Sequence, residues 1–358
     1  MIIKKKKILI FQPILTHYRA SLFNNMTKYF DLTLCYNKLN QKEGFLKIKN
    51  KTKIKTIITS KINFFYSFFQ TNLITNIINN KYDKVLLTCD VKNITNYIIL
   101  VLCKLIGVRC YIWGHGLFGK PNNFPKKLIY LLYYFFLNLF IYRYIAYNRY
   151  SKITLLKVFN KKKILILNNR LEKHLPIIKK NHNSKNILFI GRLRNRCMLD
   201  ILLRAMVIVN QKYKDLKLEI IGNGELFDEY NKLAKKLKIN YKFYKEKKDF
   251  ISISKNCFVG VYPGDAGLSV VEYMMLGLPV IKHNKMNDHA GPEPFYIINN
   301  YNGLTFKKGS SIDLSKKIIR IFSDKKLRNK LKKNSLKKIN KINKTPMSKE
   351  FVKILNLS

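Results

Sequence analysis

The 358-residue chain holds 69 Lys and Arg residues against 20 Asp and Glu, a formal net charge of +49, and 47% of it is hydrophobic. This length predicts two domains, because single cores stop growing at about 250–300 residues. Only eleven basic residues are Arg, and the charge is even: residues 1–150 hold 24 basic and 4 acidic residues, and residues 151–358 hold 45 and 16. Even, lysine-dominated charge argues against a nucleic-acid partner and favours an anionic membrane surface.

The six cysteines are scattered, with no Cys-x-x-Cys pair, at positions 35, 89, 103, 110, 197 and 257. This spacing predicts a reducing, cytoplasmic protein without a disulfide framework or a zinc site. The N-terminal apolar run is short and no small-residue cleavage site follows it, so it indicates a first strand rather than a signal peptide.

Strand-like runs alternate with helix-length segments in the first half of the chain, the pattern of parallel sheets covered by helices. A strand, a helix and a second strand are predicted over 7–11, 21–29 and 32–36, and further strands over 85–89, 108–113, 144–147 and 164–169. The polar segment 179–185 is typical of a linker.

The longest apolar run, residues 128–142, follows Lys126 and Lys127 and precedes Arg143. It falls short of the ~20 residues that span a bilayer. Two interpretations remain open, a buried helix and a helix that lies in the membrane interface.

A second series of strands and helices begins at residue 186. Strands are predicted over 186–191, 217–224, 241–244, 257–262 and 279–283, and helices over 198–213, 225–237, 249–254 and 267–276. The fold class is therefore α/β, with two doubly wound domains facing across a cleft where ligands of such folds bind. The predicted domains are 1–178 and 179–335. A helical tail over 336–358 follows, and a tail that crosses back to the N-terminal domain is one of its possible courses.

The stretch YPGDAGLSVVE joins a buried strand to a helix through Gly264 and Gly267. A helix N-terminus favours an anion, and glycines let backbone approach a ligand closely. Glu272 lies on that helix without a basic residue at i+4, so it either meets a vicinal diol such as a ribose or is an exposed surface residue.

Two further strand ends carry residues suited to phosphate. Arg192 follows the first strand of the second series, near Arg194 and Arg196, and guanidinium groups bind pyrophosphate in a bidentate way. A solvated loop is the alternative. Gly222 and Gly224 form a second strand–glycine–helix turn, which is weak evidence by itself.

In the first half, His115 stands between two glycines at a strand's carboxyl end, which suits hydrogen bonding or proton transfer. His17 and Arg19 follow the first strand. Two roles remain open for Arg19: its side chain either binds an acidic group or donates hydrogen bonds to nearby carbonyls.

The order GRL, IGNGEL, YPGDAGLSVVEYMMLGLPVI and NGLTF resembles the donor-binding domain of GT-B glycosyltransferases of family 4. The WGHG segment is similar to members that act on bacterial surface polysaccharides. The resemblance implies a nucleotide-sugar donor, UDP- or GDP-linked, with no cofactor and no metal ion. Arg192 would contact the diphosphate and Glu272 the ribose, while His115 would face the sugar from the acceptor domain. The remaining implied donor residues are Arg196, Gly222, Gly224, Gly264, Asp265, Gly267, Leu268 and Ser269, and His17 and Arg19 lie on the acceptor side.

The chain departs from the family pattern twice. Gly264 stands where the family often has a glutamate, so either Asp265 holds the sugar hydroxyls or that contact is lost. Cys197 stands where a lysine is usual, with Arg196 as the nearest substitute. His289 and Glu293 lie downstream and are weaker candidates for the same site.

These observations predict a metal-independent retaining glycosyltransferase that extends a surface glycan, on a glycan or lipid-linked acceptor, peripherally bound to the inner face of the cytoplasmic membrane. The alternatives are a sugar-nucleotide epimerase or an inverting transferase of the same fold, and a non-catalytic basic protein that binds membrane or nucleic acid.

Overall fold

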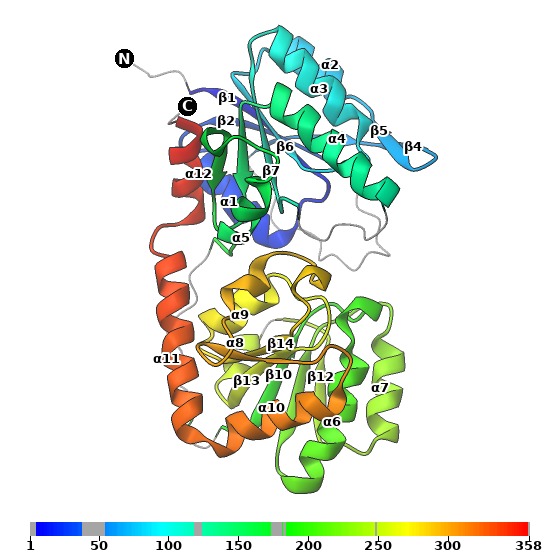
Figure 1. Ribbon diagram of the computed structural model, residues 1–358, viewed down its shortest axis with the longest axis vertical. Helices are drawn as coiled ribbons and strands as arrows, with labels where there is room; N and C mark the ends of the chain where they lie inside the picture. The colour runs from blue at the N-terminus through cyan, green and yellow to red at the C-terminus, as the bar shows by residue number, and fades with distance from the viewer. Residues whose placement is uncertain are drawn as a thin grey trace. The chain divides into compact units, whose positions relative to one another are not determined.

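The computed structural model describes residues 5–37, 54–117, 124–172, 181, 184–247 and 249–356, without the side chains of residues 17, 124, 126 and 127. The chain divides into two compact units (Figure 1). Unit 1 takes the described residues up to 172 and again from 345, and unit 2 takes those from 181 to 344. Each unit is described separately below.

Unit 1 contains a parallel seven-stranded sheet of order β3-β2-β1-β6-β7-β8-β9. Strand side chains alternate between the two faces, as the period of two requires: Leu9 and Phe11 enter one core and Ile8 and Ile10 the other. The sheet strands are β1 Lys7–Gln12, β2 Asp31–Asn37, β3 Lys55–Thr59, β6 Lys84–Thr88, β7 Arg109–Gly114, β8 Arg143–Ala146 and β9 Ile164–Ile166.

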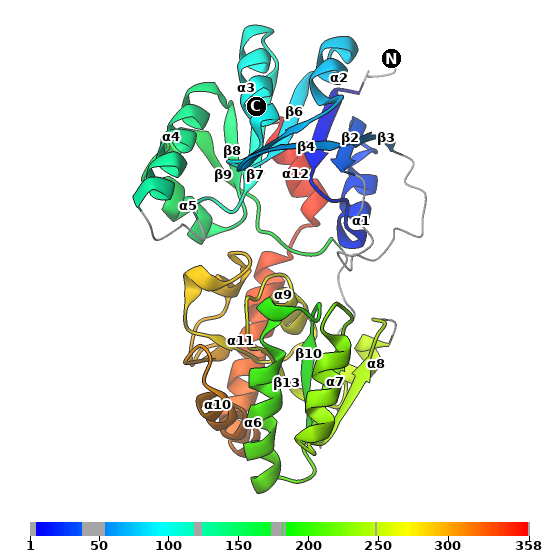
Figure 2. The same cartoon turned by 90° about the vertical axis from the view of Figure 1, so that its right-hand side faces the viewer.

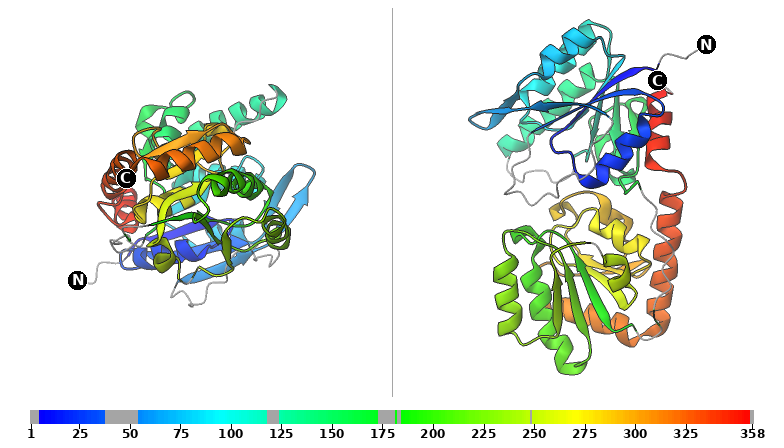
Figure 3. Two further views of the ribbon diagram at one scale, coloured as in Figure 1. Left: turned by 90° about the horizontal axis from the view of Figure 1, so that it is seen from below. Right: turned by 180° about the vertical axis from the view of Figure 1, so that it is seen from behind.

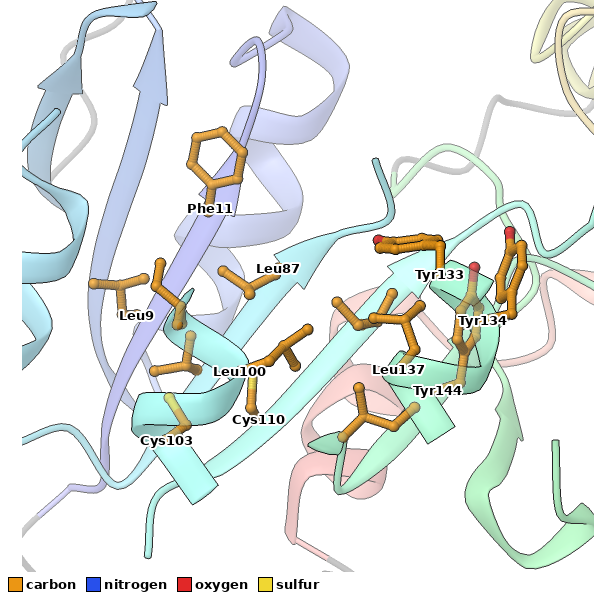
Figure 4. Packing of buried hydrophobic residues seen from close by; sticks show 14 of the residues in the cluster. Leu9, Phe11, Leu87, Leu100, Cys103, Cys110, Tyr133, Tyr134, Leu137 and Tyr144 are labelled. Atoms are coloured by element: carbon orange, nitrogen blue, oxygen red, sulfur yellow. The ribbon is translucent and has the colours of Figure 1, made fainter. Parts of the chain in front are cut away.

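Helices cover both faces of this sheet. On one face α2 Leu73–Asn80, α3 Ile94–Leu105, α4 Phe124–Phe140 and α5 Arg149–Leu155 contribute to the core drawn in Figure 4. On the other face α1 His17–Met26 packs beside the C-terminal helix α12 Met347–Asn356, as the view from behind in Figure 3 shows. Unit 1 is therefore completed by residues from both ends of the chain.

An antiparallel hairpin, β4 Lys61–Phe64 and β5 Ser67–Gln70, projects from unit 1 next to α3 (Figures 1 and 2). Its two-residue turn is Phe65-Tyr66. The N–H of Phe68 donates to the carbonyl of Lys92 at 2.9 Å, which fixes the hairpin to the loop before α3.

The apolar run 128–142 forms most of α4, which is buried on one side and exposed on the other. Tyr133, Tyr134 and Leu137 are buried in the core of Figure 4, whereas Leu132 and Phe135 are 60% and 62% exposed. Among the helices of the described residues, none is both long and apolar enough to cross a bilayer.

Unit 2 contains a parallel six-stranded sheet of order β12-β11-β10-β13-β14-β15. Its apolar strand runs and amphipathic helices form the second layered domain visible in Figure 2. The strands are β10 Asn186–Ile190, β11 Lys217–Ile221, β12 Tyr241–Tyr244, β13 Cys257–Tyr262, β14 Val280–His283 and β15 Gly303–Phe306. The helices are α6 Leu199–Lys212, α7 Phe227–Lys236, α8 Phe250–Ser254, α9 Ser269–Met275, α10 Ser311–Ser323 and α11 Lys325–Ile342.

The α/β class with two doubly wound domains is confirmed. The predicted bounds of the first helix were wrong: α1 runs from His17 to Met26 rather than over 21–29, and its residues Leu22, Phe23 and Met26 reach the core. The expected tail from residue 336 begins inside α11. Residues up to 344 belong to unit 2 and α12 belongs to unit 1.

Candidate functional site

The carboxyl ends of β10 to β14 lie at one edge of the unit 2 sheet because neighbouring strands are parallel. We call this the unit 2 edge and define it by residues 191–197, 222–224, 247, 264–272 and 283–293. In doubly wound sheets this is where ligands bind. Arg192 is half-buried here, directly after Gly191.

The Gly-x-Gly turn after β11 packs against the turn after β10. A Cβ atom at Gly222 would clash with the carbonyl oxygen of Gly191, and one at Gly224 would clash with that of Leu193. The N–H of Leu193 donates to the carbonyl of Asn223 at 3.1 Å. Glycine is therefore required at both positions because the two turns are in backbone contact within unit 2.

Gly264 is fixed by a similar close contact. Its Cβ would clash with the carbonyl oxygen of Arg196 and would lie 2.6 Å from the carbonyl carbon of Cys197. The N–H of Asp265 donates to the Arg196 carbonyl at 2.8 Å. This packing leaves no room for a glutamate at position 264, which accounts for the first departure from the family pattern.

Asp265 is the acid beside this contact. Its carboxylate lies 3.6 Å from Nε of Arg196 and 3.9 Å from Nζ of Lys308. Burial raises the pKa of Asp265, while Lys308 and Arg196 act in the opposite direction. The side chain of Arg196 is 71% exposed, so this cation is largely solvated.

Cys197, at the position of the usual lysine, points into the core instead of toward the edge. It is fully buried, and its Sγ lies 3.6 Å from the hydroxyl of Tyr230. Burial raises its pKa, so the thiol is neutral. Cys197 thus contributes packing and no charge.

Glu272 has a partner that the sequence did not reveal. Its carboxylate forms an ion pair with Lys247, which follows β12, and the side chain of Glu272 is only 13% exposed. The ammonium of Lys247 also lies 5.2 Å from the ring centroid of Phe250. The alternative of an exposed surface glutamate is therefore wrong. The one available signal for Lys247 was its position at a strand's carboxyl end.

Two buried histidines support the loop that carries Asp265. The rings of His283 and His289 stack with centroids 3.8 Å apart and planes 14° apart. Nδ1 of His289 accepts the N–H of Ala266 at 3.2 Å, so its Nε2 carries the proton and faces the His283 carbonyl at 3.3 Å. Burial lowers the pKa of His283 to about 4 and that of His289 to about 2, and both rings are neutral.

Gly267, just before α9, has more room around its Cβ position than Gly264 has. The nearest atom to its ideal Cβ position is Oε2 of Glu293, at 3.9 Å. Glu293 is buried, 2% exposed, and so lies below this surface. Leu268 and Ser269 follow Gly267, and α9 begins at Ser269.

In unit 1, His115 lies directly after β7 in a tightly packed turn. A Cβ at Gly114 would lie 2.6 Å from Cβ of Cys89, and Gly116 has φ +73° with the Ser151 carbonyl 2.8 Å from its Cβ position. The hydroxyl of Tyr144 accepts the N–H of Gly116 at 3.1 Å. Both glycines are therefore needed for the turn to pack this closely against Cys89 and Ser151. The hydrogen bond to Tyr144 holds the turn in place.

His115 borders a pocket of about 170 Å³ within unit 1. Its walls include Cys89, Asp90, Lys92, His115, Tyr130 and Tyr133. Burial first, and Arg19 second, lower the pKa of His115 to about 4, so the imidazole is neutral. Its buried Nδ1 has no hydrogen-bond partner among the described residues.

The acceptor-side predictions remain untested. Arg19 is 5% exposed, donates to Asn169 and lies with its guanidinium 4.5 Å from the ring centroid of Trp113. It holds no carboxylate in an ion pair among the described residues. The side chain of His17 is outside the described part. Within the described ranges, no group of three or more His, Cys, Asp or Glu residues is arranged to bind a metal ion.

Comparisons with known proteins identify the fold. Residues 171–338 match the family model for glycosyl transferases group 1. HepE of Anabaena, solved in complex with UDP, superimposes with a TM-score of 0.74 at 13% identity, covering 99% of this chain and 100% of the other. Another of its structures contains UDP-glucose.

Two further solved structures are similar over nearly the whole chain. A mutant form of S. aureus TarM, in complex with fondaparinux, α-GlcNAc-glycerol and UDP, gives a TM-score of 0.70 at 14% identity, covering 98% and 99% of the two chains. Sucrose-phosphate synthase of Thermosynechococcus elongatus gives 0.72 at 12% identity, covering 99% of each. No curated protein matches the sequence. The protein has the GT-B fold, and residues 171–338 match the model of the group 1 glycosyl transferases.

Proposed function

We propose that this protein is a retaining glycosyltransferase of family 4, which transfers a hexosyl or related sugar from a nucleotide donor to a glycan or lipid-linked acceptor of bacterial surface polysaccharide. The observation that carries the proposal is the unit 2 edge, where Arg192, the Glu272–Lys247 pair and the open backbone at Gly267 lie within the segment that matches the glycosyl transferases. UDP in the complexes of HepE and TarM supports a uridine nucleotide.

In the proposed reaction, an acceptor hydroxyl oxygen forms a bond to the anomeric carbon as the bond from that carbon to the diphosphate oxygen breaks. The hydroxyl proton leaves with the diphosphate, on the same face as the attack. Arg192 and the backbone N–H groups of Leu268 and Ser269 stabilise the negative charge that develops on the leaving group. No metal ion is required, because these groups supply the positive potential.

The ribose is assigned to Glu272. A carboxylate that is 13% exposed and held by Lys247 is oriented for two hydroxyl donors of a vicinal diol. Asp265, half desolvated beside Arg196 and Lys308, is assigned to hydroxyls of the donor sugar.

We further propose peripheral association with an anionic membrane. The net charge of +49 attracts such a surface, and the exposed apolar side chains of α4 provide area for insertion. Co-sedimentation with phosphatidylglycerol vesicles tests this: Leu132→Asp should release the protein, and equal sedimentation of wild type and variant would contradict it.

The glycosyl-transfer proposal is tested by thermal shift with UDP-, GDP- and CMP-sugars, followed by hydrolysis assays. We expect a UDP-sugar to raise the melting temperature, since saturation at 100 times Kd adds about 2.7 kcal/mol. Glu272→Ala should abolish most of that shift, and Asp265→Ala should lower turnover. If no nucleotide sugar binds or is hydrolysed, the protein is a non-catalytic member of the fold. Conversion of the donor to its epimer without transfer would instead identify an epimerase.

A further inference from the structure

The pocket beside His115 and the projecting hairpin share one loop. Asp90 and Lys92 line the pocket. The same loop accepts the N–H of Phe68 from β5, and Phe68 and Asn93 form an isolated bridge. The hairpin is therefore attached to the pocket rim, and it packs against α3 (Figure 1).

The pocket has the chemistry of a sugar subsite. Its volume of about 170 Å³ is far above the ~10–15 Å³ that one water needs. Tyrosine rings of α4 form one wall, and polar groups come from Asp90, Lys92 and Nδ1 of His115, which has no hydrogen-bond partner among the described residues. Aromatic faces with a few fixed polar groups suit an uncharged ring that carries several hydroxyls.

The inner wall of the pocket is neutral. The Sγ of Cys89 lies 3.8 Å from the hydroxyl of Tyr133 and 3.7 Å from that of Tyr134, and burial raises the pKa of all three groups. A neutral wall does not favour an anion such as phosphate over a sugar.

Apolar side chains reach solvent on α4, which lines this pocket, and on the hairpin, which is joined to the pocket loop through Lys92. At the hairpin turn Phe65 is fully exposed and Tyr66 is 88% exposed. Phe65 has φ +43°, a conformation that side-chain-bearing residues adopt at a cost and that turns usually give to Gly or Asn. On α4 the exposed stripe comprises Leu128, Leu132, Phe135 and Leu139.

The excess of basic over acidic residues in this part of unit 1 indicates which kind of partner these apolar side chains contact. Between residues 54 and 142 the chain has only two acids, Asp83 and Asp90. The described basic residues near the hairpin and α3 include Lys61, Lys92 and Lys104, and all three are exposed. Exposed aromatics with dispersed lysines match an anionic lipid surface, where aromatics enter the interface and ammonium groups meet headgroups.

We propose that this pocket binds the terminal sugar of a lipid-linked acceptor, and that the aromatic hairpin and the exposed stripe of α4 rest on the membrane in which that lipid is anchored. The proposal rests on the glycosyl-transfer function and specifies its acceptor. A polar pocket whose rim is fixed to a membrane-binding hairpin favours a sugar presented at the bilayer over the same sugar free in water.

The first experiment compares, for each of four sugars, a membrane-anchored glycoside with a soluble glycoside of the same sugar. UDP-glucose is the donor, and dodecyl glycosides of glucose, galactose, mannose and N-acetylglucosamine in vesicles of phosphatidylethanolamine and phosphatidylglycerol are compared with the methyl glycosides in solution. For the accepted sugar, kcat/KM should be at least about tenfold higher for the dodecyl form, since anchoring raises the local acceptor concentration. The double variant Phe65→Ser/Tyr66→Ser should lose most of this preference. Ile312→Ser, a matched change at a 60% exposed position on α10, should keep it.

Equal use of the two forms by the wild type overturns the proposal, as does an unchanged preference in the hairpin variant. Donor hydrolysis without transfer to any dodecyl glycoside overturns it too, while leaving the proposed function intact. Absence of both UDP binding and hydrolysis contradicts the proposed function instead. Vesicle sedimentation still tests the hairpin in that case, because equal sedimentation of wild type and double variant would overturn its role.

The second experiment tests the pocket. Asp90→Asn and Tyr130→Ala should raise KM for the dodecyl glycoside by about tenfold, as expected for loss of one charge-assisted hydrogen bond or one aromatic wall. The thermal shift caused by UDP should stay, because both residues lie in unit 1. An unchanged KM in both variants would place the acceptor elsewhere.

Discussion

The unit 2 edge and the inner wall of the unit 1 pocket differ in the charge of their polar side chains. At the unit 2 edge, Glu272 is paired with Lys247, and Asp265 lies near Arg196 and Lys308. The inner wall of the unit 1 pocket holds tyrosine hydroxyls and a thiol whose pKa values burial raises, and the imidazole of His115 is neutral. One surface is built from compensated charges and the other largely from neutral dipoles.

This difference separates the two ligands that a transferase requires. A nucleoside diphosphate carries charge, so its site needs fixed cations and acids that can exchange partners on binding. A sugar acceptor is uncharged, and the neutral inner wall of the unit 1 pocket would contact it without the cost of desolvating ions, which leaves Asp90 and Lys92 as the charged lining residues. The four predictions below test this distinction, from the largest expected effect to the smallest.

Gly264→Glu should damage the unit 2 edge most. The new side chain restores the acid usual in the family, but its Cβ would collide with the backbone at Arg196, at an expected cost of about 3 kcal/mol in the free energy of unfolding. Urea denaturation would measure this. Gly267→Ala is the matched control, because no atom lies nearer than 3.9 Å to its Cβ position. Equal stability of the two variants would show that the loop at Gly264 yields easily.

Acidification should weaken unit 2 through its stacked histidines. The folded-state pKa values of His283 and His289, about 4 and about 2, lie below the ordinary 6.5. Their contribution is complete above pH 6.5 and is lost as the pH falls toward about 4, since the unfolded chain then binds more protons than the folded chain. The neighbouring charges are Lys282, Lys308 and Asp288.

Denaturation curves across this pH range would show the loss. A His283→Asn/His289→Asn variant, which keeps amide groups in both places, should have a flatter pH profile than the wild type. Parallel profiles would mean that other groups cause the acid sensitivity.

Tyr144→Phe should affect unit 1 moderately. Removing the hydroxyl leaves the buried N–H of Gly116 without its acceptor at 3.1 Å, which costs about 1–2 kcal/mol. Thermal unfolding with Tyr29→Phe as an exposed control would measure it. The acceptor KM should rise as well, because Gly116 lines the pocket. A change in UDP binding would contradict the separation of the two sites.

Arg196→Ala should have the smallest effect on stability, less than about 0.5 kcal/mol. Its guanidinium is 71% exposed and 3.6 Å from Asp265, so water and salt screen the pair. A larger loss in chemical denaturation would show that this pair holds the loop at Asp265 closed.

Most strands of the two sheets followed from the sequence because buried parallel strands are continuous apolar runs, and their carboxyl ends located Arg192, Gly264 and His115. The strands β3 and β15 were not predicted, and β3 is largely exposed. The hairpin was missed because Phe65-Tyr66 replaces the Gly or Asn typical of such turns. The partner of Glu272 was also missed. Lys247 is distant along the chain, and only the parallel register of the sheet brings the two together.

Single-residue departures from the family pattern were visible in the sequence, but their causes were not. Gly264 and Cys197 stood out as substitutions of charged residues. Only packing shows that position 264 has no room for a side chain and that position 197 faces the core.

The C-terminal helix α12 affects the order in which the protein can mature on the ribosome. Domains generally fold as they are synthesised, N-terminal first. Here the core that buries Phe351 and Leu355 beside α1 stays incomplete until α12 emerges, whereas the described residues of unit 2 are all made before α12. Unit 2 can thus fold while unit 1 still exposes one face of its sheet. A stop codon before Met347 would leave that face of the sheet without α12, and the exposed apolar surface would direct the nascent protein to chaperones or proteolysis.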